Sequence, residues 1–169
     1  MADDLKEMLA GLRAAMQAER TGEQFYRAAA ERTLDPLGRE VFAHLAEEEA
    51  EHFRFLKAHY QAIGETGQLA DVALGKGAQL GDESPIFSPG FRQRIREAHF
   101  EMSALAIAVQ LELNGIRHYQ EQARAAKAPA ARKFFEDLAH WESGHYDALL
   151  RQQKLLEEEY WREQGFEPF

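Results

Sequence analysis

One series of positions near the start of the chain, mostly apolar, recurs at alternating spacings of four and three residues. The series runs Leu5, Leu9, Leu12, Met16, Glu19, Glu23, Tyr26 and Ala30. This spacing is typical of one face of a helix, and it predicts a long helix that ends near Arg32. Glu19 lies in the middle of this face, at a position where leucine or isoleucine would be the ordinary residue.

A second helix is predicted from Pro36 to about residue 63. Asp35 before Pro36 is typical of a helix start, because its carboxylate can accept from free backbone N–H groups and proline has a preset φ. Gly64 is the expected residue at the end of this helix.

Residues 64–90 lose the helical periodicity and are rich in Gly, Ser and Pro, so we expect a long connection. A short helical piece is expected within it, around residues 69–74. Helices are predicted over residues 91–126 and 129–160, and strand signals are nearly absent. Two helical hairpins joined by one long crossover predict an all-α four-helix bundle, and we interpret residues 1–169 as a single domain.

The two hairpins are copies of each other at a constant offset of 93 positions. The matched pairs include Glu19/Glu112, Gly22/Gly115, Tyr26/Tyr119, Pro36/Pro129, Phe42/Phe135, Glu49/Glu142, His52/His145 and Leu56/Leu149. Helical periodicity alone would match apolar residues with apolar residues, but it would not match Glu, Tyr, Pro and His in one register. The repeat therefore indicates a duplicated hairpin packed about a pseudo-two-fold axis.

Duplication predicts that polar side chains meet in the centre of the bundle. Residues three apart share one face of a helix, so Glu49 and His52 point the same way, as do Glu142 and His145. With Glu19 and Glu112, four carboxylates and two imidazoles converge. Such a cluster is costly to bury unless protons or cations balance its charge.

Two divalent cations would balance the four carboxylates, and mixed carboxylate and imidazole ligands suit iron or manganese. A single Glu-x-x-His pair in a chain this rich in glutamate usually lies on a solvated face. Two such pairs at the same offset as two mid-stripe glutamates favour a metal site instead. These residue types leave the choice between iron and manganese open, and Zn could also be loaded.

Composition restricts the remaining functions. The net charge of −9 argues against nucleic acid or an anionic membrane as partner. Apolar runs fall far short of the ~20 residues that span a bilayer, and the acidic start is not typical of a signal peptide. The absence of cysteine excludes disulfides and thiolate metal sites. A cytoplasmic location is the default expectation.

The six-residue pattern resembles the ferritin-like di-iron carboxylate proteins of the rubrerythrin type, over essentially the whole chain. The resemblance implies a ferritin-like, left-handed four-helix bundle with a two-iron centre that reacts with dioxygen or hydrogen peroxide. It implies that Glu49 and Glu142 bridge the metals and that Glu19 and Glu112 bind one metal each.

Three departures from the rubrerythrin pattern bear on mechanism. Without cysteines the chain cannot form a rubredoxin-like iron site, so electrons must come from another protein or a small reductant. No further carboxylate follows Glu112 within the next turn, so the six-ligand set is closer to that of bacterioferritin. Glu48 and Ala50 flank Glu49 where bacterioferritin carries its haem-binding Met, so haem is not implied.

Tyr26 and Tyr119 lie two helical turns after their glutamates. Each phenol could hydrogen-bond a ligand carboxylate of the partner helix or be oxidised, and the alternative is an ordinary core tyrosine. In related di-iron proteins an acidic residue at the position of Glu48 orients a ligand histidine. In the second repeat, the residue that matches Glu48 is Trp141. This difference predicts that the two metal positions are inequivalent.

Several residues are expected to lie outside the cluster. Glu23 has Ile116 as its counterpart, and an exposed or capping role is the main interpretation, with a labile ligand as the alternative. His44, His59, His99, His118 and His140 have no repeat-matched histidine, so we expect them at the surface or at helix ends.

The leading functional hypothesis is an oxidoreductase of the peroxidase or ferroxidase type, acting on peroxide or dioxygen. The alternatives are a metal-handling or iron-storage protein without turnover, and a metal-free structural bundle. A homodimer is expected, because Phe53, Phe55 and Phe87 suggest an apolar surface.

Overall fold

The protein is a bundle of four long helices. A computed structural model describes residues 2–73, 86–92 and 98–165. The helices are α1 (Ala2–Arg32), α2 (Pro36–Thr66), the short α3 (Pro89–Arg92), α4 (His99–Ala125) and α5 (Pro129–Glu163). The described residues form no strand, so the predicted all-α, ferritin-like bundle is confirmed.

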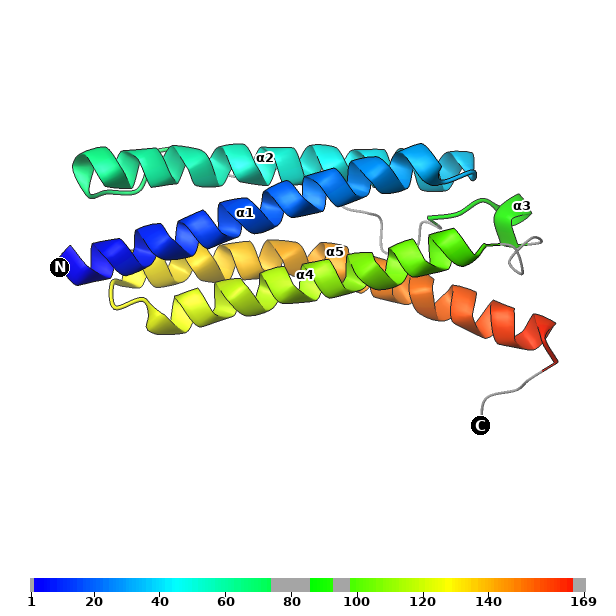
Figure 1. Cartoon of the computed structure of the whole chain (residues 1–169). Coiled ribbons are helices and arrows are strands. Elements are labelled where there is room, and N and C mark those ends of the chain that lie inside the picture. The colour runs from blue at the N-terminus through cyan, green and yellow to red at the C-terminus, as the bar shows by residue number, and fades with distance from the viewer. Residues whose placement is uncertain (1, 74–85, 93–97, 166–169) are drawn as a thin grey trace.

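The helices pair as two hairpins, α1 with α2 and α4 with α5, and α1 also packs against α4 (Figure 1). The end of α2 and the start of α4 lie at opposite ends of the bundle (Figure 1). The connection between the hairpins must therefore span the length of the bundle, as the predicted crossover requires.

The end of α2 differs from the sequence-based prediction. The helix continues three residues beyond Ile63 to Thr66, and Gly64 lies inside it. Gly67 ends it with φ of 74°, a left-handed conformation that glycine adopts without a steric penalty, and its N–H donates to the Ile63 carbonyl. The short helical piece expected at residues 69–74 is absent from residues 69–73, and residue 74 lies outside the described residues.

The third predicted helix, over residues 91–126, is also corrected. Residues 89–92 form the separate helix α3, and α4 begins only at His99. Residues 74–85 of the predicted connection and residues 93–97 of the predicted helix lie outside the described part of the chain. The fourth predicted helix is correct at its start and extends three residues beyond Tyr160 to Glu163.

The apolar core is divided into two clusters along the bundle axis. One cluster contains Tyr26, Phe42, Leu105 and Leu149, near the α1–α2 turn. The other, near the α4–α5 turn, contains Leu12, Leu56, Tyr119 and Phe135. In every long helix, the polar residues predicted to converge lie between the residues of these two clusters. The polar cluster is thus a layer inside the core.

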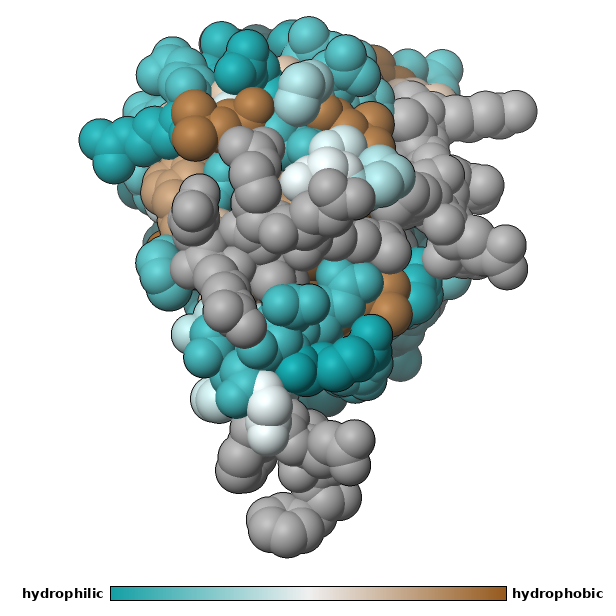
Figure 2. Space-filling view, turned by 90° about the vertical axis from the view of Figure 1, so that its right-hand side faces the viewer, coloured by the Kyte–Doolittle hydropathy of each residue, from teal (hydrophilic) through white to brown (hydrophobic). Residues whose placement is uncertain are grey.

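The expected apolar surface was based on Phe53, Phe55 and Phe87, of which Phe53 and Phe55 are half-buried. Figure 2, which views the end of the bundle near α3, shows a mostly hydrophilic surface with a few hydrophobic patches. Phe87 is buried in the core at 1% exposure, stacked on Phe91, because the end of the crossover packs onto the first apolar cluster. Its predicted contribution to an exposed surface is therefore wrong. None of the described helices combines the length and the apolar character needed to span a bilayer.

Asp35 fixes both the start of α2 and the end of the crossover. Its carboxylate accepts from the Gly38 N–H at 2.9 Å, as expected for an N-cap residue, and from the Ser88 N–H at 3.1 Å and the Ser88 hydroxyl. Burial would raise the pKa of Asp35, but these hydrogen bonds outweigh burial and lower it. The matching residue in the second hairpin is Ala128, which has no side-chain cap.

We predict that Asp35→Ala lowers the free energy of unfolding by about 1–2 kcal/mol, because the cap and the tie to Ser88 are lost together. Since the folded state holds Asp35 ionised, the loss should shrink as the pH falls below 3.8, the ordinary pKa of the group. Urea denaturation at several pH values measures this. Ala128→Asp, the reciprocal variant, should raise stability by about 1 kcal/mol. An Asp35→Ala protein with an unchanged free energy of unfolding would contradict the stabilising role of the Asp35 cap.

Candidate metal centre

The six residues predicted to converge are all buried in the middle of the bundle. Glu19 comes from α1, Glu49 and His52 from α2, Glu112 from α4, and Glu142 and His145 from α5. Each is at most 5% exposed. Every long helix therefore contributes to one buried polar layer.

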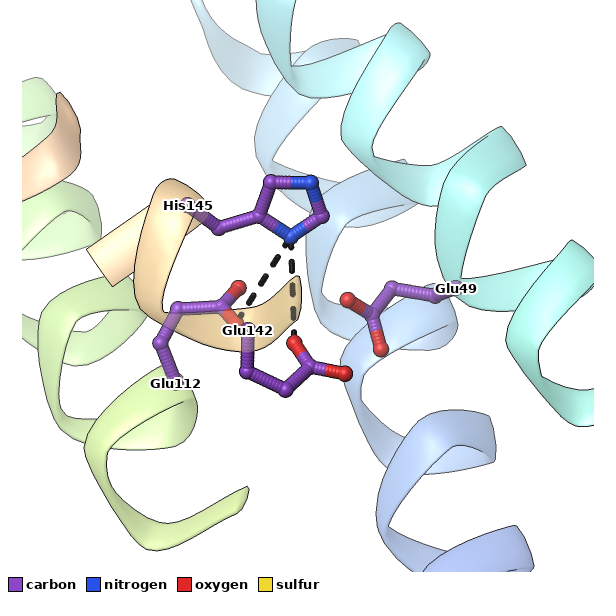
Figure 3. Close-up of side chains that lie close together, drawn as sticks. All are labelled: Glu49, Glu112, Glu142 and His145. Atoms are coloured by element: carbon purple, nitrogen blue, oxygen red, sulfur yellow. Dashed lines mark ion pairs between the residues drawn. The ribbon is translucent and has the colours of Figure 1, made fainter. Parts of the chain in front are cut away.

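Ligand-type atoms of these residues form two groups that overlap. Glu49, Glu112, Glu142 and His145 each offer one atom within 4.8 Å of the others, and Glu19, His52 and Glu142 form a second such group. Figure 3 shows the three carboxylates of the first group pointing towards one another from α2, α4 and α5, with the His145 ring beside them. Glu142 is common to both groups: its Oε1 lies 3.0 Å from His52 Nδ1 and its Oε2 lies 3.8 Å from His145 Nδ1.

Each tyrosine contacts the glutamate of the other repeat. Tyr26 donates to Glu112 Oε1, and Tyr119 donates to Glu19 Oε1. The other oxygen of each glutamate faces an imidazole: Glu19 Oε2 lies 3.1 Å from His52 Nδ1, and Glu112 Oε2 lies 3.8 Å from His145 Nδ1. The tyrosines thus fix one oxygen of each carboxylate and leave the other directed at the centre.

The two imidazoles have different surroundings on their outer side. His145 Nε2 lies 3.0 Å from Glu48 Oε2, although Glu48 belongs to the other hairpin. The His52 ring lies against Trp141, with ring centroids 3.7 Å apart. Glu48 and Trp141 are repeat-matched positions, so each half places this residue against the histidine of the other half.

The charges of the cluster raise the pKa of both imidazoles. Burial alone would lower the pKa of His52, but the carboxylates of Glu142 and Glu19 outweigh burial and raise it to about 10. Burial is outweighed in the same way at His145, whose pKa rises to about 9 because Glu48, Glu112 and Glu142 surround it. The carboxylates around both rings therefore favour a positive charge within the cluster.

The carboxylates respond to their neighbours in opposite directions. Burial and the adjacent carboxylates raise the pKa of Glu49 and of Glu112 well above the usual range. Burial would also raise the pKa of Glu142, but the two imidazoles override it and lower that pKa to about 2. Protons therefore compete with metal ions for the same atoms.

A cavity of about 370 Å³ lies between α1 and α4 and reaches the carboxylate layer. Its lining includes Ala14, Gln17, Ala18, Thr21, Gly22, Asn114 and Gly115, together with the four carboxylates. Gly22 closely approaches Glu49: a Cβ there would lie 2.7 Å from Glu49 Oε2, so the carboxylate would have to shift. The repeat-matched Gly115 is less constrained, with its nearest contact at 3.9 Å.

Two residues differ from the sequence-based interpretation of the surroundings. Glu23 is buried rather than exposed, and it pairs with Arg20 at 3.2 Å and Arg27 at 2.8 Å instead of joining the cluster. His59 is also buried, at 3% exposure, and accepts from the Ala70 N–H at 3.2 Å. The expectation that it lies at the surface is wrong, since aromatic neighbours cover its ring.

The remaining unmatched histidines agree better with the expectation. His99 and His140 are exposed, and His44 is half-buried beside Glu48. His118 is half-buried, with Nε2 3.1 Å from the Gly11 carbonyl. The periodicity around His59 was a usable signal for its burial, because it lies seven residues after His52, two turns along the same helix face.

We predict that Gly22→Ala weakens metal binding at the cluster by roughly tenfold or more, because the new methyl group displaces the Glu49 carboxylate. Gly115→Ala is the matched control and should leave metal affinity unchanged. It should also raise the free energy of unfolding by about 0.5–1 kcal/mol through helix propensity. Titration calorimetry with Zn²⁺ and urea denaturation measure both effects. Equal metal affinity of the two variants would contradict the conclusion that Gly22 makes room for the Glu49 carboxylate.

We also predict that Zn²⁺ binding releases protons and strengthens as the pH rises from about 6.5 to about 8. The reason is that the raised pKa values of His52 and His145 keep protons on the imidazoles throughout this range. Calorimetry in buffers of different ionisation enthalpy counts the released protons. Zn²⁺ binding that is independent of pH and releases no protons would contradict the proposed competition between protons and metal ions.

The comparisons with known proteins agree with this geometry. The rubrerythrin family model matches residues 11–153, and a second match covers residues 103–168. No match was found among curated proteins or among solved structures. Because the first match covers most of the chain, including all six clustered residues, the chain belongs to the rubrerythrin family.

Proposed function

We propose that the protein is a di-iron oxidoreductase that acts on hydrogen peroxide or dioxygen in the cytoplasm. The six clustered residues, Glu19, Glu49, His52, Glu112, Glu142 and His145, would hold the two iron ions. The rubrerythrin family normally binds iron, which makes iron the first choice over Mn or Zn.

One observation carries the proposal: two groups of buried ligand atoms overlap at Glu142. Two atoms that are each about 2.1 Å from one cation lie at most about 4.2 Å apart. Groups within 4.8 Å therefore need only small side-chain rotations to bind an ion each. Glu142 would bind both ions. Glu49 would be the second carboxylate shared by the two ions, because it belongs to the group with Glu112 and His145 and also hydrogen-bonds Glu19 of the other group.

When bound, two ferrous ions would supply one electron each to peroxide, which takes up two electrons and two protons to give two water molecules. The chain's own contribution is to hold the ligands in place. Tyr26 and Tyr119 keep their protons, because burial and nearby carboxylates raise the pKa of both phenols. Each phenol therefore stays a donor and fixes one carboxylate oxygen.

The cavity between α1 and α4 is the proposed route for the small substrate. It reaches Glu19 and Glu112 from the side opposite the α2–α5 histidines, and its walls include the small residues Ala18 and Gly22. A molecule of two oxygen atoms fits readily in about 370 Å³. Because the chain contains no cysteine, electrons would arrive from a separate donor protein or a small reductant.

We predict that protein loaded with two Fe²⁺ per chain is oxidised rapidly by hydrogen peroxide or by dioxygen in stopped-flow absorption measurements. Faster reaction with peroxide would favour a peroxidase, and faster reaction with dioxygen a ferroxidase. Glu142→Gln should slow the oxidation at least tenfold, since it removes the carboxylate common to both groups. Glu136→Gln, an exposed residue on the same helix, is the matched control.

Inertness of the loaded protein to both oxidants would contradict the oxidoreductase proposal and favour metal handling or storage without turnover. Light scattering separates storage further, because a storage cage requires many subunits. We propose a homodimer, with about twice the mass of the 19.3 kDa chain.

A further inference from the structure

We propose that the two metal positions are inequivalent, and that the ion held by Glu112 and His145 binds more tightly than the ion held by Glu19 and His52. The inference rests on the proposed metal-binding function and goes beyond it, because it assigns the order of binding. It follows from the environments of the two imidazoles.

His145 is held by a carboxylate on the side away from the centre. Its Nε2 lies 3.0 Å from Glu48 Oε2, and both side chains are buried. A carboxylate at this distance keeps the proton on Nε2, so that Nδ1 presents its lone pair to the centre, and it makes the imidazole a stronger ligand. Glu48 also adds a negative charge near this position, which further favours a cation there.

His52 lacks the corresponding partner. Its Nε2 is buried and has no hydrogen-bond partner among the described residues. The place of a carboxylate is taken by the Trp141 ring, 3.7 Å away between centroids. When Nδ1 binds a cation, Nε2 must carry the proton, and a buried N–H without an acceptor costs free energy. The metal-bound form of His52 therefore lacks the acceptor that Glu48 provides to the metal-bound form of His145.

The remaining contacts of the two positions differ mainly in Glu49, which groups with Glu112, Glu142 and His145 but not with Glu19 and His52. Each has one glutamate tied to a tyrosine of the other repeat, and Glu142 takes part in both. The exchange of Glu48 for Trp141 is therefore the principal difference at the imidazoles. Loss of such an outer hydrogen bond weakens metal binding by roughly 10–100-fold in other proteins, which sets the expected difference.

Zn²⁺ titration of the metal-free full-length protein tests the proposal without any redox reaction. We expect two binding steps whose dissociation constants differ by at least tenfold. An anomalous-scattering crystal map at one Zn²⁺ per chain should show the ion between Glu112 and His145. Equal occupancy, or an ion beside Glu19 and His52, would overturn the assignment.

Variants then connect the difference to Glu48. Glu48→Gln should weaken the tighter step by roughly 10–100-fold and leave the weaker step unchanged. A purely structural role of Glu48 would weaken both steps together, which would overturn the proposal. Glu47→Gln removes an adjacent, exposed carboxylate and should change neither step.

Trp141→Glu is the reciprocal test, because it supplies the missing carboxylate beside His52. It should tighten the weaker step so that the two steps approach each other. The wild-type crystal map decides the proposal even if this variant does not fold. Failure of the wild-type protein to bind any Zn²⁺ or Fe²⁺ would contradict the proposed function itself, whereas two equal sites would contradict only this inference.

Discussion

The burial of four carboxylates and two imidazoles inside a helical bundle is the constraint on which the rest of the structure depends. Six such groups replace apolar side chains in the middle of the core and divide it into two separate apolar clusters. Their burial is tolerable only if protons or cations balance the charge. The raised pKa values of His52 and His145 show how strongly this layer attracts positive charge.

The duplicated hairpin explains how one chain builds the buried polar cluster. Each half supplies a glutamate from its first helix and a Glu-x-x-His pair from its second. The halves also support each other, because Tyr26 holds Glu112 and Tyr119 holds Glu19. Neither half is complete alone, so assembly of the site and docking of the two hairpins are the same event.

The departures from symmetry carry the specific properties of this protein. Asp35 caps α2 and ties the crossover to it, whereas Ala128 leaves α5 uncapped. Gly22 leaves space for the Glu49 carboxylate, whereas a Cβ at Gly115 would make only an ordinary van der Waals contact with Glu142. Glu48 and Trp141 give the two histidines a polar and an aromatic neighbour. Duplication set the common framework, and these exchanges differentiate its halves.

The sequence by itself determined the four long helices, the crossover and the identity of the six converging residues, because helical periodicity and a gapless repeat are properties of spacing alone. Spacing could not choose between Gly64 and Gly67 as the end of α2, because glycine can adopt the left-handed conformation of Gly67 at either position. Nor could it place the start of α4 at His99 or show that His59 and Phe87 are buried. Only the tertiary structure decided which residue of one hairpin meets which residue of the other. The contacts of Glu48 with His145 and of Trp141 with His52 depend on how the two hairpins dock, and that docking is a property of three-dimensional packing.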